Sequence, residues 1–108
     1  MNIKEKIALF QTLNSDEFLR EKLFYDVLDK CNANKINYVD YMTTHPIECD
    51  VELRRLPTAD YDLCCALLTM LLREDHFNNG SFERRQRQGQ VKPIVERIIE
   101  LLSLEELK

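Results

Sequence analysis

The feature that most constrains the fold of this chain is a long apolar run in its second half. Between residues 59 and 77, almost every side of a helical projection is apolar. The apolar residues that produce this pattern are Leu63, Leu67, Leu68, Met70, Leu71 and Leu72. A helix of this kind has to be surrounded by other elements, because any side left bare would expose apolar surface to water. The sequence therefore predicts a central helix over residues 59–77.

The scarcity of glycine and proline favours helices in the rest of the chain as well. The 108 residues include two glycines and three prolines, whereas an all-β domain needs many tight turns built from such residues. A chain of this length corresponds to one domain with a modest core. We therefore predict an all-α fold, a compact bundle of about four to five helices that forms a single domain over residues 1–108.

Capping residues and apolar spacing indicate where the other helices begin and end. A first helix is expected from Ile3 to Leu13. Asn14 is then the expected N-cap of a second helix that ends near Asp29, because asparagine accepts hydrogen bonds from the free N–H groups of a first turn. Thr58 is expected to cap the central helix in the same way. Pro93 is expected in the first turn of the last helix, where proline is tolerated.

The stretch between the second and the central helix gives a weaker pattern. Residues 36–42 alternate in polarity and are aromatic, which fits either a short extended segment or a helical turn packed on the core. Pro46 and Pro57 bracket a loop with room for one short helix.

A sharp turn is expected after the central helix. Gly80 follows two asparagines, and glycine adopts the left-handed conformation that ends helices more readily than other residues do. We place Gly80 at the position just beyond the C-cap, with Ser81 capping the next helix. Phe82 would then fold back beside Phe77. Gly89 is expected to end that short helix in the same way.

Charge and hydropathy exclude several classes of function. The net charge is −4 at pH 7, whereas proteins devoted to nucleic acid or to anionic membranes carry the opposite balance. No stretch approaches the roughly 18 apolar residues of a membrane span, and no apolar run of signal-peptide length follows the N-terminus. We therefore expect a cytoplasmic protein that binds no membrane.

The four cysteines do not form a recognisable metal site. In the cytoplasm, Cys31, Cys49, Cys64 and Cys65 are expected to be reduced thiols. His45 and Cys49 could supply half of a zinc site, but the spacing of the other cysteines matches no zinc-binding pattern. Buried cysteines that act as small apolar residues fit the sequence better. We therefore predict neither a metal ion nor a cofactor.

One side of the central helix is polar. Asp62, Cys65, Thr69, Arg73 and His76 fall within roughly 80° of one another at 100° per residue. One interpretation is the wall of a pocket, in which Arg73 binds an anion and His76 acts as an acid or base near neutral pH. The other is the solvent-facing side of an amphipathic helix, which is the commoner origin of such a stripe.

Two carboxylates, Glu74 and Asp75, fall inside the apolar arc near the end of the same helix. Negative charge there opposes the helix dipole, so these side chains need cationic partners. The candidates are Arg84, Arg85 and Arg97. A structural salt bridge explains the two residues better than a catalytic carboxylate does.

The short basic segment after the turn suggests a further class of function. A helix, a glycine turn and a second helix with Arg84, Arg85 and Arg87 have the outline of a helix-turn-helix, and arginine reads base edges well. The acidic balance of the chain argues against nucleic-acid binding.

Several segments together resemble one known family. The most specific is the pattern Arg-x-x-basic-Phe-x-x-Gly over residues 73–80, and residues 37–42 resemble a second segment of that family. The chain is similar in this way, over about two thirds of its length, to domain of unknown function family 6508 from bacteria and archaea. In that family the second basic position is often arginine and a cysteine often follows the phenylalanine, whereas this chain has His76 and Asn78. The resemblance implies one compact helical domain and no particular activity, cofactor or partner.

Two functions from different classes remain open. The favoured one is a non-enzymatic protein-interaction or self-association module, expected to be a dimer, because so apolar a helix in a short chain leaves more apolar surface than its neighbours cover. The alternative is a small enzyme or an anion-binding pocket built from Arg73, Asp75, His76 and Asn79. An apolar surface patch would favour the first, and a concave pocket in which Arg73 and His76 converge would favour the second.

Overall fold

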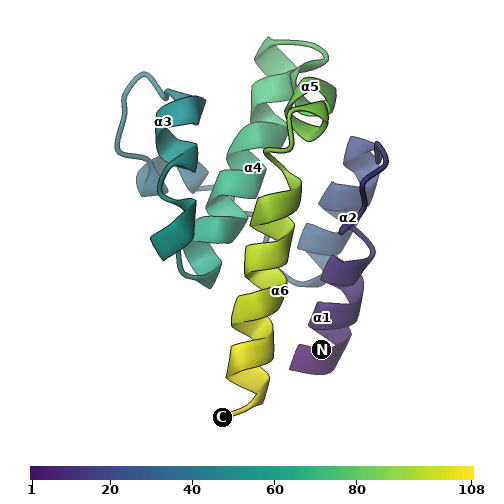
Figure 1. Ribbon diagram of the computed structural model, residues 1–108. Helices are drawn as coiled ribbons and strands as arrows, with labels where there is room; N and C mark the ends of the chain where they lie inside the picture. The colour runs from purple at the N-terminus through teal and green to yellow at the C-terminus, as the bar shows by residue number, and fades with distance from the viewer.

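Helices make up the whole regular structure of the protein. The computed structural model describes residues 1–108 and contains no strand (Figure 1). The α-helices are α1 (Ile3–Gln11), α2 (Glu21–Lys30), α3 (Cys49–Leu53), α4 (Tyr61–Phe77), α5 (Ser81–Arg87) and α6 (Lys92–Glu106). Two short 3₁₀ turns, η1 (Tyr38–Tyr41) and η2 (Leu56–Thr58), lie between α2 and α4. The all-α prediction is therefore confirmed.

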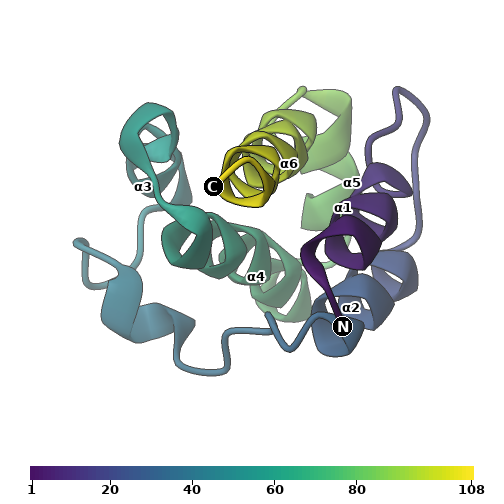
Figure 2. The ribbon, with the colours of Figure 1, turned by 90° about the horizontal axis from the view of Figure 1, so that it is seen from below.

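Helix α4 is the centre of the fold, as its apolar circumference predicts. Residues 64–72 are all buried, with no more than 2% of any side chain exposed. Helices α3, α5 and α6 and the turn η1 pack against α4, while α1 packs along α6. Figure 2 shows α4 between α3 and α2 with α6 lying across it. A helix with neighbours on this many sides needs no polar face.

The start of α4 differs slightly from the prediction. Asp60, and not Thr58, is the N-cap: its carboxylate accepts a hydrogen bond from the backbone N–H of Leu63 at 2.8 Å. Thr58 instead ends η2. Both residue types cap helices well, and Asp60 has the advantage that its negative charge is stabilised at the positive end of the helix dipole.

The prediction that a helix begins after Asn14 is wrong. Residues 12–20 form a loop, and α2 begins at Glu21. The side chain of Gln86 holds this loop: its Oε1 accepts from the N–H of Leu19 at 3.0 Å, and its Nε2 donates to the C=O of Leu19 at 2.9 Å. A helix starting at Asn14 would use those same backbone groups internally, so the contact with α5 replaces it.

The segment after α2 is a helical turn, and the extended alternative for residues 36–42 is wrong. Tyr38 and Tyr41 are both half-buried against the core, and a 3₁₀ turn brings residues three apart onto one side. Asn32, at φ 53°, lies in the left-handed region and redirects the chain after α2. Lys35 then ties the segment to α4 through a hydrogen bond from its N–H to Thr69 Oγ1 at 3.3 Å.

The loop before α3 is organised around a fully buried carboxylate, that of Glu52. It accepts hydrogen bonds from the backbone N–H and the hydroxyl of both Thr43 and Thr44, and from Arg55 Nη1 at 2.9 Å. Burial acts to raise the pKa of Glu52, but these hydrogen bonds outweigh burial and lower it to about 2. Arg55 also donates to the C=O of Tyr41 at 2.7 Å. One ionised side chain therefore fixes the path of the chain from η1 to α3.

The turn between α4 and α5 contains the predicted left-handed glycine, but the capping residues around it differ from those predicted. Gly80 is left-handed, at φ 88°, which confirms that part of the prediction. Because α4 ends with Asn78 as its C-cap, Gly80 lies two residues beyond that cap and directly precedes α5. Ser81 is the first residue of α5 and does not cap it. The carboxylate of Asp75 does so instead, accepting from the N–H of Phe82 at 3.1 Å.

The two phenylalanines beside this turn face different environments. Phe82 is fully buried and packs edge-on against Phe24 of α2, with 4.9 Å between ring centroids. Phe77 is 89% exposed. The prediction that Phe82 lies beside Phe77 is therefore wrong: Phe82 enters the core against α2, whereas Phe77 remains exposed at the end of α4.

The last part of the chain follows the prediction. Gly89 has φ 73° and lies directly after the C-cap of α5, Gln88. Pro93 occupies the first turn of α6. No helix of the protein combines the length and the apolarity that crossing a bilayer requires.

Candidate functional site

The polar stripe of α4 is covered by the chain itself only at its middle. Cys65 and Thr69 are fully buried beneath the segment that follows α2. Asp62 pairs with Lys35 Nζ at 3.0 Å on the same side. Burial raises the pKa of the Cys65 thiol to about 12, so it stays protonated. The interpretation of the stripe as a solvent-facing side is wrong for Cys65 and Thr69, because the chain after α2 crosses them, whereas Asp62 and His76 are exposed as that interpretation expects.

Three residues of the predicted polar cluster, Arg73, Asp75 and His76, lie near Tyr25 of α2. Asp75 caps α5, as described above. His76 is exposed, with its Nε2 3.4 Å from the hydroxyl oxygen of Tyr25 on α2. Arg73 makes no salt bridge, and its Nε is buried without a hydrogen bond. Asn79 is exposed in the turn after α4.

A second carboxyl group, that of Glu21, lies beside Asp75, and the sequence analysis did not predict that it belongs to this cluster. Burial and a hydrogen bond with Asp75 raise the pKa of Glu21. Burial also acts to raise the pKa of Asp75, but hydrogen bonds from the backbone of Phe82 and from Glu21 hold it below its usual range. Glu21 is therefore the group of this pair that keeps its proton to higher pH, and Asp75 is the one that stays ionised more readily. The signal available in the sequence was the spacing of Glu21 and Tyr25, four residues apart on one side of α2.

The arginine-rich helix α5 contributes to the interior. Arg85 is 4% exposed and binds Glu74 with two hydrogen bonds, Nε to Oε1 at 3.0 Å and Nη2 to Oε2 at 2.8 Å. Its Nη1 also donates to Asp50 at 2.6 Å and to Gln90 at 3.0 Å. The predicted salt bridge of Glu74 is therefore present, with Arg85 as its partner. It joins α3, α4 and α5 and leaves Arg85 unable to contact nucleic acid.

An apolar groove lies beside the end of α4, and we call it the Phe77 groove. It has a volume of about 460 Å³. Its lining residues are Tyr38, Pro46, Ile47, Cys49, Met70, Glu74, Phe77 and Asn78. Burial is the largest cause that raises the pKa of the Cys49 thiol to about 11, with Glu74 adding to it, so Cys49 forms a neutral part of the wall. Phe77 is an exposed residue of this lining, together with Pro46 and Asn78.

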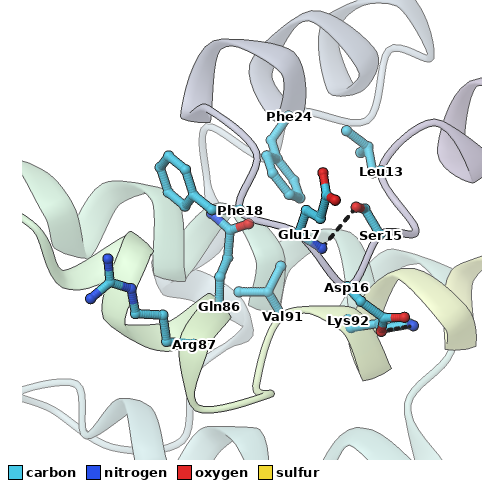
Figure 3. Close-up of a pocket in the computed structure, with 10 residues that line it drawn as sticks. All are labelled: Leu13, Ser15, Asp16, Glu17, Phe18, Phe24, Gln86, Arg87, Val91 and Lys92. Atoms are coloured by element: carbon cyan, nitrogen blue, oxygen red, sulfur yellow. Dashed lines mark hydrogen bonds and ion pairs between the residues drawn. The ribbon is translucent and has the colours of Figure 1, made fainter.

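Two other cavities differ from this groove. The cavity drawn in Figure 3, between the loop after α1 and helices α5 and α6, has a volume of about 60 Å³, enough for a few water molecules. Gln86 and Val91 form one side of it, and the ion pair of Asp16 with Lys92 closes one end. A third, about 570 Å³ in volume, lies between the free ends of α1 and α6. Arg73, Asp75, His76 and Asn79 line none of these three cavities.

No metal site is built from the side chains of the protein. All four cysteines are free, and no group of three or more His, Cys, Asp or Glu side chains is arranged to hold an ion. Burial raises the pKa of Cys31 and Cys64 as it does that of Cys49 and Cys65. A thiol with a raised pKa is a poor nucleophile and a poor metal ligand.

Comparison with known families gives one match, a family of unknown function (DUF6508), over residues 11–103. The chain belongs to DUF6508. The DUF6508 match runs from the end of α1 to the last turns of α6, so it includes the Phe77 groove, Glu21 and the predicted polar cluster. It confirms the resemblance found on residues 37–42 and 73–80. No curated protein and no solved structure is significantly similar to this DUF6508 chain.

Proposed function

We propose that this DUF6508 protein is a non-enzymatic interaction module that associates with a second copy of itself through the Phe77 groove. The observation that carries the proposal is the exposure of Phe77. A phenylalanine that is 89% exposed, beside an apolar groove of about 460 Å³, forms a projection next to a hollow. Full burial of such a side chain stabilises an interface by about 2 kcal/mol, and aromatic residues dominate the energetics of many interfaces.

The position of the projection supports self-association. In a symmetric dimer the same surface serves on both copies, so a projection and a hollow side by side fill each other twice. Other walls of the groove, Ile47, Met70 and Tyr38, offer apolar surface of the kind that receives a phenyl ring.

The alternative functions have less support. In the enzyme or anion-binding alternative, Arg73, Asp75 and His76 would converge on a ligand, but Asp75 is engaged in capping α5. Nucleic-acid binding would draw on three arginines of α5, but Arg85 is buried in its network and Arg87 pairs with Glu83 at 2.7 Å.

The test is a measurement of oligomeric state by sedimentation equilibrium over a wide range of protein concentration. Wild-type protein is expected to show a monomer–dimer equilibrium. Phe77→Ala removes the ring from both copies, a loss of about 4 kcal/mol, and should therefore weaken the dimer by roughly 10²- to 10³-fold. The matched control is Leu107→Ala, since Leu107 is 83% exposed and lies at the opposite end of the molecule (Figure 1).

Two outcomes would contradict the proposal. The first is wild-type protein that remains monomeric at every concentration. The second is a dimer that Phe77→Ala leaves intact, above all if Leu107→Ala dissociates it, because the interface would then lie at the ends of α1 and α6.

A further inference from the structure

The cavity at the ends of α1 and α6, which we call the α1–α6 cavity, has a cation without a counter-ion in its wall. Lys6 of α1 is half-buried, lines this cavity and takes part in no salt bridge. The other two half-buried lysines of the protein, Lys35 and Lys92, each pair with an aspartate. A half-buried ammonium group gains stability from an anionic partner, so Lys6 offers a site for an anion.

The residues around Lys6 do not neutralise its charge. The one acidic residue of the lining, Glu105, pairs with Lys108, with 3.3 Å between its Oε2 and the lysine Nζ. The charge of Lys6 acts to lower the pKa of the Cys31 thiol, but burial has the larger effect and raises that pKa, so the thiol stays neutral. Neither of the other two cavities has an unpaired cation in its lining.

The rest of the lining is apolar. The cavity has a volume of about 570 Å³, which lies within the range of roughly 300 to 1,000 Å³ found for pockets that hold small molecules. Its apolar residues are Ile3, Tyr61, Leu101, Leu102 and Leu104. Ile3 and Lys6 are three residues apart and therefore lie on one side of α1. Figure 1 shows the ends of α1 and α6 side by side at one end of the molecule, so one site combines a cation with an apolar wall.

We infer that the α1–α6 cavity binds a fatty acid as its carboxylate, with the head group at Lys6 and the alkyl chain against the leucines of α6. A carboxylate carries one negative charge and so balances one ammonium group, whereas a phosphate monoester carries nearly two. Each methylene group that leaves water for the apolar wall adds affinity. This site is separate from the Phe77 interface and does not depend on it.

The experiment is isothermal titration calorimetry of the full chain with decanoate, kept below the concentration at which it forms micelles, and with decanol, the neutral alcohol of the same length. One decanoate should bind per chain, and it should bind more tightly than decanol. From hexanoate to octanoate to decanoate, each added methylene group should tighten binding about two- to fourfold, because complete burial of one such group gives about fourfold. An affinity that does not rise with chain length would overturn the inference.

Lys6→Met tests the role of the charge, because methionine keeps an unbranched side chain and removes the ammonium group. It should weaken decanoate binding about threefold to tenfold without weakening decanol binding. The matched control is Lys4→Met, since Lys4 is exposed on the same helix and lies outside the lining. Equal effects of the two substitutions on decanoate, or an equal loss of decanoate and decanol in Lys6→Met, would refute the pairing with Lys6.

Leu104→Asp tests the apolar wall. Leu104 lines the cavity and is 53% exposed, so the folded protein should tolerate its replacement, and a thermal melt checks this. The variant should bind both decanoate and decanol at least about tenfold more weakly. Leu107→Asp is the matched control, because Leu107 is exposed on the same helix end and does not line the cavity. Equal effects of the two substitutions would place the ligand elsewhere.

Three further results would overturn the inference. They are the absence of saturable decanoate binding, the uptake of many molecules per chain, and dissociation of the wild-type dimer by decanoate. The last result would show that a second copy of the chain occupies this cavity. If instead Phe77→Ala leaves the dimer intact while one decanoate still binds, the proposed Phe77 interface is refuted and the fatty-acid site stands.

Discussion

The replacement Glu52→Gln tests how much one buried charge contributes to this small fold. Glu52 is fully buried and ionised, and its pKa is lowered from 4.5 to about 2. Each pKa unit corresponds to about 1.4 kcal/mol, so the ionised group stabilises the folded state by about 3 kcal/mol at neutral pH. Glutamine would put an amide N–H₂ against donors from Thr43, Thr44 or Arg55, and removing one partner of a buried charge costs about 3 to 5 kcal/mol. Both arguments predict a loss of about 3 kcal/mol.

The destabilisation caused by Glu52→Gln should depend on pH. Because the folded-state pKa of Glu52 is lowered, its contribution is complete above the unfolded value of 4.5 and disappears as the pH falls towards 2. At pH 3 about 1.4 kcal/mol remains, so the difference between wild type and Glu52→Gln should shrink by about half or more. Other carboxylates titrate equally in both proteins, and the comparison therefore cancels them.

The measurement is urea denaturation of both proteins at pH 7 and pH 3. A cost below about 1 kcal/mol at pH 7 would refute the argument from burial and hydrogen bonding. A cost that stays the same at pH 3 would show that the effect of the substitution comes from packing and not from the charge.

Two further substitutions test the turn and the interior network by urea denaturation at neutral pH. Gly80→Ala should lower the free energy of unfolding by about 1 kcal/mol, because alanine is strained at φ 88°. The strain comes from the backbone alone, since the added Cβ would meet no other atom within 4 Å. An unchanged free energy of unfolding would mean that the turn adopts another backbone conformation. Arg85→Ala should cost about 3 kcal/mol by leaving the carboxylate of Glu74 without its cation, whereas the control Arg84→Ala should stay within about 0.5 kcal/mol. Equal costs at the two arginines would contradict the buried network.

The fold was predictable where local signals agree with the tertiary structure. Three features were predicted from neighbouring residues alone and are present in the structure. They are the apolar run of α4, the left-handed glycines, and Pro93 in the first turn of α6. The loop after Asn14 was not predictable, because its conformation depends on a side chain 67 residues away from Leu19, that of Gln86. No local pattern reports such a contact.

The candidate site was predictable only in part. The segment from Arg73 to Gly80 stood out in the sequence, and it does form the end of α4 and the turn beside the groove. The groove itself needs Pro46 and Ile47, which come from a distant loop. That loop is fixed by the buried Glu52, and a glutamate gives no sign in the sequence that it will be buried, since most glutamates are exposed.

Helix α4 has a buried middle, where substitutions affect the core, and an exposed end, where they do not. Any substitution within residues 64–72 disturbs several neighbouring helices at once, so the helix tolerates change there only if its neighbours change with it. The exposed side chains near the end of the same helix touch little of the core, and Phe77 least of all. The last turn of α4 can therefore change its surface chemistry without any repacking of the interior.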